Sequence, residues 1–226
     1  MSITRRRLVP LLALALCLGP GGGRAGACET ALLLAIDVSG SIDRGEYRLQ
    51  VGGLAEALAD PELADALVLG QTALAVLQWS GSGQQEMVVP WTRMLSPGHV
   101  ARLAARLRGL PRRFDGSDTA VGEAIGFAAA QFGAVADCRR KVIDISGDGP
   151  QNAGRPLAPE RGGAIRAGIE INAIAIEDAG RSSPITRFYQ RLVITPRGFV
   201  MTARGLGDYP RAIRAKILRE IARPLG

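Results

Sequence analysis

The chain has 226 residues, of which 47% are hydrophobic and 22% charged. That is enough to bury one substantial core, and no shift in composition marks a second domain. The formal net charge of +7 suggests a nucleic-acid partner, but four of the arginines lie in the first 27 residues, which contain no acid. The remainder has 24 basic and 21 acidic residues and no basic stripe, although 207–223 is moderately basic. We therefore expect no nucleic-acid partner.

The first 27 residues have the design of an export signal. Arg5-Arg6-Arg7 gives a positive start, 8–18 an apolar run and 19–23 a helix-breaking stretch, before the small-x-small pattern Ala25-Gly26-Ala27 that a signal peptidase accepts. The apolar run is about half the length that spans a bilayer. Residues 4–9 also resemble a twin-arginine signal, so export by either the Sec or the twin-arginine route stays open.

We therefore expect a signal peptide over 1–27 and a single domain over 28–226, located in the periplasm or secreted. No later stretch is long and apolar enough for a transmembrane helix, so we expect no membrane span after signal cleavage.

The mature region alternates apolar runs with helical spacing. In chain order, the pattern predicts a strand at 30–36, a helix at 43–59, a hairpin of strands at 73–79 and 86–91, helices at 99–107 and 120–132, a strand at 141–146, a helix at 157–167, a strand at 170–176, a short helix at 185–189, a last strand pair near 191–201 and a closing helix at 209–222. Such alternation indicates a doubly wound α/β fold: a mostly parallel, six-stranded sheet with one antiparallel edge strand and helices on both faces.

Polar residues follow the strand ends, where ligands gather in such sheets. Asp37-Val38-Ser39-Gly40-Ser41 follows the first strand, Gly147-Asp148-Gly149 follows the strand at 141–146, and the loop 114–119 opens a helix between them. These segments offer carboxylates and hydroxyls but no His or Cys. Hard oxygen donors suit Mg²⁺ or Mn²⁺ and do not suit zinc or copper.

At these residues a resemblance becomes specific. Asp37-x-Ser39-x-Ser41, the later Thr119 and Asp148-Gly149 resemble the metal-ion-dependent adhesion site of von Willebrand factor A domains, in that family's order, over about residues 30 to 222. The wider phrases 35–43 and 142–149 are similar to a bacterial exported subgroup of uncharacterised function, the DUF1194-like proteins.

The resemblance implies a set of five metal-site residues around one cation, with Asp148 acting through water: Asp37, Ser39, Ser41, Thr119 and Asp148. One coordination position remains for an Asp or Glu carboxylate of an unidentified protein partner. Asp118 stands where many members of the family have a small residue. If Asp118 faced the cation, it would tighten metal binding and weaken the attraction for an acidic ligand.

The implied function is a non-enzymatic, divalent-cation-dependent protein-binding module of the adhesion type, acting outside the cytoplasm. A Mg²⁺-dependent, phosphatase-type hydrolase with Asp37 as nucleophile is one alternative, but Ser39 stands where that class has a second Asp. A metal-free scaffold of the same fold is another. His99 is the single histidine, so the chain has no ordinary Ser-His-Asp triad.

Once Cys17 leaves with the leader, Cys28 and Cys138 remain. They precede the first strand and the strand at 141–146, which are parallel neighbours in the strand order 3-2-1-4-5-6. Both should therefore enter at the amino-terminal edge of the sheet, opposite the metal site, where we predict a disulfide. Lipid attachment at Cys28 is an alternative, although Ala25 stands where a lipobox has Leu. Asp144, inside a strand, needs buried partners, and we expect a hydrogen-bond network there.

Overall fold

The computed structural model describes residues 28–116, 118–178, 180 and 182–222, so the expected signal peptide over 1–27 lies outside the described residues. Six strands form one sheet in the order β3-β2-β1-β4-β5-β6. They are β1 (Thr30–Asp37), β2 (Ala73–Trp79), β3 (Gln85–Arg93), β4 (Arg140–Gly147), β5 (Ile169–Glu177) and β6 (Val200–Arg204). All neighbouring pairs are parallel except β2 and β3, which form the antiparallel edge. The predicted doubly wound fold is confirmed.

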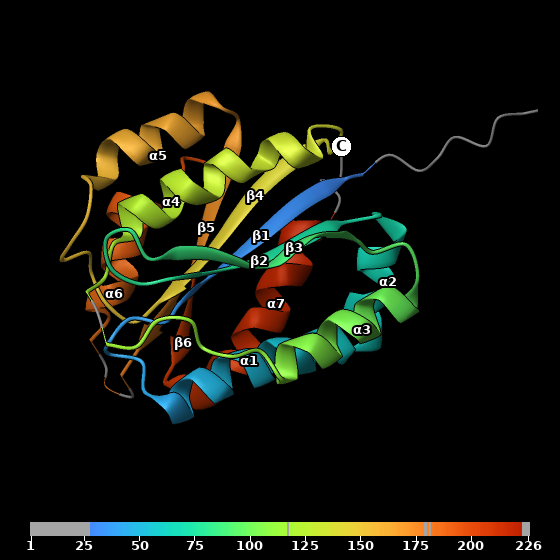
Figure 1. Ribbon diagram of the computed structural model, residues 1–226, viewed down its shortest axis with the longest axis horizontal. Coiled ribbons are helices and arrows are strands. Elements are labelled where there is room, and N and C mark those ends of the chain that lie inside the picture. Colours follow the sequence, from blue (N-terminus) through green and yellow to red (C-terminus); the bar gives the residue numbers. More distant parts are fainter. Residues whose placement is uncertain (1–27, 117, 179, 181, 223–226) are drawn as a thin grey trace, which may run out of the picture.

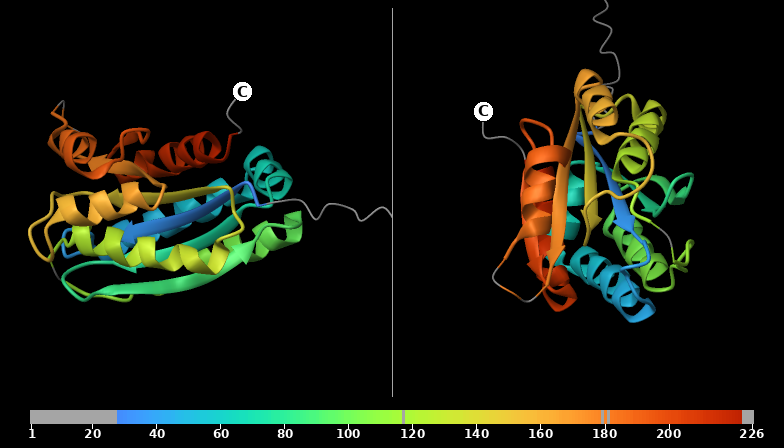
Figure 2. Two further views of the ribbon diagram at one scale, coloured as in Figure 1. Left: turned by 90° about the horizontal axis from the view of Figure 1, so that it is seen from above. Right: turned by 90° about the vertical axis from the view of Figure 1, so that its left-hand side faces the viewer.

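Helices cover both faces of this sheet. The α-helices are α1 (Arg44–Ala59), α2 (Pro61–Leu69), α3 (Pro97–Arg108), α4 (Val121–Ala130), α5 (Leu157–Arg166), α6 (Pro184–Phe188) and α7 (Tyr209–Ile221). Two short 3₁₀ turns, η1 (Gln131–Val135) and η3 (Leu206–Asp208), and one π turn, η2 (Tyr189–Val193), complete the set. Figure 1 shows α4 and α5 along one face and α1 and α3 along the other, and Figure 2 shows the sheet between these layers.

The strand β1 contributes side chains to the hydrophobic clusters on both faces of the sheet. All eight of its residues are buried. Successive side chains of a strand point to opposite faces, so Leu32 and Leu34 pack in the cluster that contains α1, α2, α3 and α7 residues. Leu33 and Ala35 pack in the cluster that contains α4 and α5 residues. A central parallel strand covered on both faces is expected to be apolar throughout, as this one is.

Local capping fixes where α1 and α2 begin. Asp43 accepts hydrogen bonds from the backbone N–H groups of Gly45 (2.6 Å) and Glu46 (2.8 Å), and Glu46 Oε2 accepts from Asp43 N–H (2.8 Å), which is a capping box. The helix α2 was not predicted from the sequence. Its signals were present: Asp60 accepts from Leu63 N–H at 3.1 Å, and proline occupies the first helical position.

The predicted strand pair near 191–201 is wrong. The chain continues from α6 into the π turn η2, and β6 is the one strand there, pairing with β5. Pro196 has no N–H to give to a ladder. Gly198 N–H donates to Thr195 O (2.9 Å), and a Cβ on Gly198 would clash with Ile171 O, so this stretch turns tightly against the sheet instead of forming a strand.

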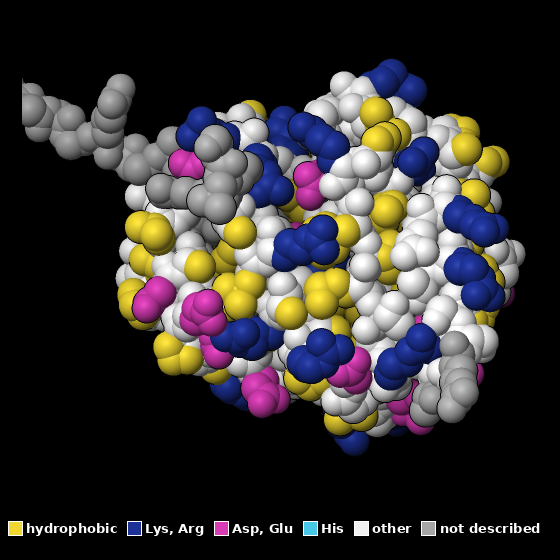
Figure 3. All heavy atoms as spheres, turned by 180° about the vertical axis from the view of Figure 1, so that it is seen from behind, with side chains coloured by type: hydrophobic (Ala, Val, Ile, Leu, Met, Phe, Trp, Pro, Cys, Tyr) yellow, Lys and Arg dark blue, Asp and Glu magenta, His cyan; other side chains and the backbone are white. Residues whose placement is uncertain are grey.

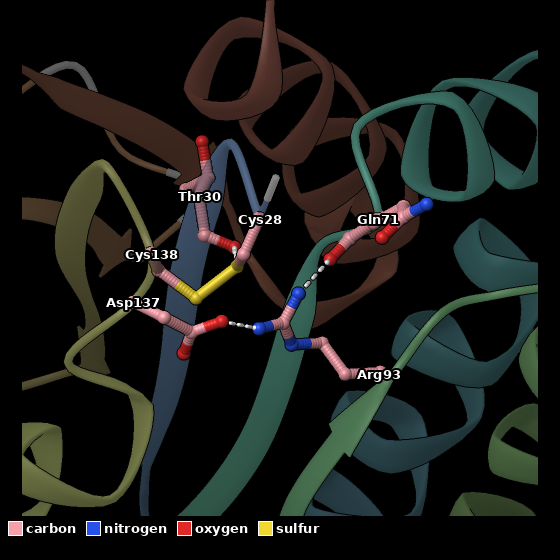
Figure 4. The surroundings of a disulfide bond; sticks show 6 residues. All are labelled: Cys28, Thr30, Gln71, Arg93, Asp137 and Cys138. Atoms are coloured by element: carbon pink, nitrogen blue, oxygen red, sulfur yellow. Dashed lines mark hydrogen bonds and ion pairs between the residues drawn. A yellow bond between two sulfur atoms is a disulfide. The ribbon is translucent and has the colours of Figure 1, made fainter. Parts of the chain in front are cut away.

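A disulfide joins Cys28 to Cys138 at the amino-terminal edge of the sheet, with the two Cα atoms 4.4 Å apart. The parallel pairing of β1 with β4 places both residues there, just before each strand (Figure 4). Arg139 N–H donates to Cys28 O at 2.9 Å. Beside the disulfide, Arg93 forms an ion pair with Asp137. A disulfide, a hydrogen bond and an ion pair therefore hold the chain together at this edge of the sheet.

Much of the basic charge in the segment 207–222 is paired with acidic side chains. Arg211 pairs with Asp208 at 2.6 Å, Arg214 pairs with Asp60 at 2.9 Å, and Lys216 is buried. On the face drawn in Figure 3, basic side chains are spread among apolar, acidic and uncharged ones rather than gathered in one stripe. Among the described residues, no helix is long and apolar enough to cross a membrane.

Candidate metal centre

The carboxyl ends of β1 and β4 bring four of the predicted site residues together. Asp37 is the last residue of β1, and Asp148 directly follows β4. Asp37 Oδ1 accepts from Ser39 N–H at 2.8 Å, the Ser39 and Ser41 hydroxyl oxygens are 3.3 Å apart, and the Ser41 hydroxyl donates to Asp148 Oδ1 at 2.7 Å. An unbroken chain of polar contacts thus runs from the buried Asp37 to the half-buried Asp148.

The loop after β1 is held in place by its neighbours. Val38 N–H donates to Trp79 O (2.9 Å), which extends the pairing with β2 past the strand end, and Ile42 N–H closes a turn onto Ser39 O (3.0 Å). From the other side, Arg112 Nη2 donates to Val38 O (2.9 Å) and Ser39 O (3.0 Å). Arg112 was not predicted from the sequence, because its contacts are with backbone atoms more than 70 positions away and no motif marks them.

Thr119 lies at the same edge, held by its backbone. Its N–H donates to Asn152 Oδ1 at 2.8 Å, and its carbonyl accepts from Asn152 N–H at 3.1 Å. The next residue, Ala120, donates to Ser80 O, which follows β2. The described residues include no hydrogen bond between the Thr119 hydroxyl and the chain from Asp37 to Asp148. Asp118 is exposed.

Asp37 is the electrostatically unusual member of the site. It is fully buried, and among the described residues its Oδ2 has no hydrogen-bond partner. Burial raises the pKa of Asp37 to about 7, against the hydrogen bonds from Ser39; the negative charge of Asp148 adds to the rise and the positive charge of Arg112 opposes it. Burial also raises the pKa of Asp148.

Tyr189, at the start of η2, is a second residue that the sequence analysis missed. Its hydroxyl is buried and has no hydrogen-bond partner among the described residues, and burial raises its pKa well above the ordinary value. A Cβ on Gly147 would clash with this hydroxyl and lie 2.9 Å from Asp37 Oδ2. Only glycine therefore fits at position 147, and the phenol and the carboxylate both lie against it.

These groups fit a hard divalent cation. Asp37 Oδ2 is an orphaned, buried carboxylate oxygen, which costs free energy unless a ligand compensates for it. Its neighbours Ser39, Ser41 and Asp148 also offer oxygen donors, which Mg²⁺ and Mn²⁺ prefer. The described part of the chain contains no cluster of three or more His, Cys, Asp or Glu side chains that could hold a metal. A cation at this edge would therefore depend on hydroxyl ligands as much as on carboxylates.

A hollow of about 240 Å³ adjoins the site. Four carboxylate side chains are among the residues that line it: Glu46, Asp148, Glu177 and Asp178. Without a cation, these carboxylates would repel an acidic group that entered the hollow.

The sheet order and the helices on both faces are those of a von Willebrand factor A-type fold, and solved structures agree. Proximal thread matrix protein 1 from the mussel byssus is 19% identical at a TM-score of 0.65, over 84% of this chain and 48% of that one. The pilus adhesin SpaC of Lactobacillus rhamnosus GG is 13% identical at 0.63, over 85% and 30%. A von Willebrand factor type A protein from Catenulispora acidiphila is 19% identical at 0.61, over 86% and 43%. The chain spans about half or less of the length of each.

Residues 27–225 match the family described as "Protein of unknown function (DUF1194)", and the chain belongs to this family. No curated protein matches the sequence. One structure of the mussel protein, 17% identical at a TM-score of 0.64 over 84% of this chain and 48% of that one, has a zinc-occupied MIDAS motif. That finding concerns the mussel protein.

Proposed function

We propose that the protein is a non-enzymatic, divalent-cation-dependent protein-binding module of the adhesion type that acts outside the cytoplasm. The observation that carries the proposal is the buried Asp37, whose unpartnered Oδ2 lies at one end of the polar chain that leads to Asp148. One cation, Mg²⁺ or Mn²⁺, would be held by five residues: Asp37, Ser39, Ser41, Thr119 and Asp148.

The charge balance of this set favours an acidic protein ligand. Asp37 and Asp148 are its only anionic members, so a bound divalent cation keeps residual positive charge and attracts an Asp or Glu carboxylate of the partner. The acidic lining of the adjoining hollow works against such a ligand when the cation is absent. Binding should therefore require the metal and not merely improve with it.

The choice of cation should be tested broadly. The donor set favours Mg²⁺ or Mn²⁺ over zinc. The zinc-occupied MIDAS motif of the mussel protein supports a divalent-cation site of this kind and adds zinc to the ions that a titration should include.

Burial of the site supports a binding role over hydrolysis. A nucleophile must reach its substrate, whereas Asp37 is fully buried. The position two residues later, where a phosphatase of this architecture has its proton donor, is Ser39, which is also fully buried. Purified protein should therefore not hydrolyse phosphate or acyl esters in the presence of Mg²⁺.

Location outside the cytoplasm rests on two features. Residues 1–27 have the composition of an export signal. The disulfide between Cys28 and Cys138 suits an oxidising compartment such as the periplasm.

Affinity capture from a periplasmic extract tests the function. The wild-type chain in Mg²⁺ should retain a protein that EDTA releases, and Asp37→Ala should retain none. Asp65→Ala, which removes an exposed carboxylate on α2, is the matched control and should behave as wild type. Capture that is unchanged by EDTA and by Asp37→Ala would contradict the proposal.

A further inference from the structure

A second charged cluster lies inside the molecule, between β4 and α7. Asp144 comes from the middle of β4, and Lys216 and Glu220 lie one helical turn apart on α7. Asp144 is 2% exposed, and the other two are fully buried. Lys216 Nζ lies 2.6 Å from Asp144 Oδ1 and also donates a hydrogen bond to Glu220 Oε1. Asp144 thus has a buried ionic partner in Lys216, but among the described residues the predicted hydrogen-bond network does not include its carboxylate oxygens.

Phe199 and Asn172 both lie beside this triad. Lys216 Nζ lies 5.5 Å from the centre of the Phe199 ring. Asn172 Nδ2 donates to Glu220 Oε1 at 3.0 Å and so fixes that carboxyl group. The short contact between Lys216 and Asp144 lacks hydrogen-bond geometry, and neither Asp144 oxygen has a hydrogen-bond partner among the described residues. The ion pair with Lys216 still keeps two charges in the interior, and conversion of the pair to a neutral group would relieve that desolvation cost.

We propose that the side chains of Lys216 and Asp144 condense to an intramolecular isopeptide bond, with Glu220 relaying the proton. The structure holds an amine nucleophile, a carboxyl electrophile and an acid side by side in a buried site, and they need no further reactant. The reaction is intramolecular, and the sheet and the helix hold the reacting groups in place. Both features favour it strongly over the same reaction in solution.

The step balances within the triad. A proton moves from the Lys216 ammonium to the Asp144 carboxylate, which gives a free amine and a carboxylic acid. The amine nitrogen attacks Asp144 Cγ and loses a proton to Glu220, while a proton from Glu220 reaches the departing Asp144 oxygen. One C–N bond forms, one C–O bond breaks, and one water leaves. No oxidant or reductant takes part.

Glu220 suits the relay because it is an acid that keeps its proton near neutral pH. Burial raises the pKa of Glu220 to about 8, the negative charge of Asp144 adds to the rise, and Lys216 opposes it. A carboxyl group of this kind can both give and take a proton near neutral pH. The product is a neutral amide that ties the last helix to the strand that leads to Asp148.

Mass spectrometry of the full exported chain tests the proposal. The protein is denatured, reduced and alkylated, so that the disulfide adds no mass difference. Its intact mass should then be lower by one water than the value calculated from its observed N-terminus. Lys216→Arg should show the full calculated mass, and Glu220→Gln should accumulate the uncondensed chain.

Asp144→Asn provides the sharpest control. An amide at position 144 would condense with loss of ammonia in place of water, so the deficit from the variant's own calculated mass should equal one ammonia, and fragmentation should locate the link between positions 144 and 216. A wild-type chain at its full calculated mass would overturn the proposal. So would a deficit that persists in Lys216→Arg, since it would then arise from dehydration elsewhere.

Discussion

The two edges of the sheet differ in how completely their polar groups are paired. At the amino-terminal edge, Cys28 and Cys138 are joined covalently and the neighbouring Arg93 and Asp137 pair with each other. At the carboxyl-terminal edge, Asp37 Oδ2 and the Tyr189 hydroxyl are buried without a partner among the described residues. The polar groups at the amino-terminal edge are therefore paired within the chain, whereas two buried polar groups at the carboxyl-terminal edge are not.

We infer from this difference that the amino-terminal edge contributes mainly to stability and the carboxyl-terminal edge mainly to binding. β1 and β4 run from one edge to the other, and the disulfide joins them only at the amino-terminal edge. A disulfide stabilises mainly by restricting the unfolded chain and leaves the opposite edge free to bind. Stability and binding can then be altered independently.

The largest effect is expected at the amino-terminal edge. Replacing both cysteines, Cys28→Ser with Cys138→Ser, should lower the free energy of unfolding by about 2–5 kcal/mol. Urea denaturation monitored by circular dichroism measures this loss. The Mg²⁺ response of the double variant should remain, and its disappearance would show that the two edges are coupled.

A smaller gain in stability is expected at the carboxyl-terminal edge. Mg²⁺ at about 100 times its Kd should raise the free energy of unfolding by about 2.7 kcal/mol, because the ion binds only the folded chain. Asp37→Ala should abolish the gain and Asp65→Ala should keep it, as measured by thermal unfolding with Mg²⁺ or EDTA. Equal gains in wild type and Asp37→Ala would exclude Asp37 as a ligand.

The pH dependence should have opposite signs with and without metal. In the metal-free fold the pKa of Asp37 is raised from 3.8 to about 7, so its contribution to stability is present below 3.8 and is lost as the pH rises through about 7. Mg²⁺ needs the carboxylate, so its affinity should rise by up to about tenfold per pH unit towards pH 7 and then level off. Calorimetric titrations from pH 5.5 to 8 measure this, and a flat profile would contradict it.

The sequence predicted the fold well because burial dominates its pattern. β2 begins and ends where its apolar run does, and the order of strands follows from right-handed crossovers. Two elements were misread: α2, where the capping signal was overlooked, and the stretch near 191–201, where apolar residues in a π turn and a tight turn resemble strands. Periodicity alone does not separate such short apolar runs.

The candidate site was predictable only where its residues are close in sequence or follow a strand. Asp37, Ser39, Ser41 and Asp148 lie together in the structure because backbone geometry at the strand ends brings them there. Arg112 and Tyr189 act through tertiary position, and no local pattern distinguishes them from other arginines and core aromatics. For Asp144 the need for partners was foreseeable, but their identity depends on how α7 packs on the sheet.

Direct measurement of metal binding tests the central claim most directly. The metal-free chain is dialysed against Mn²⁺, and bound ion is quantified by electron paramagnetic resonance for wild type, Asp37→Ala and Asp65→Ala. The account predicts one Mn²⁺ per wild-type chain, displaced by excess Mg²⁺, with the same result for Asp65→Ala and no specific binding for Asp37→Ala. Stoichiometric Mn²⁺ on Asp37→Ala, or none on wild type, would contradict a metal centre at the carboxyl edge of the sheet.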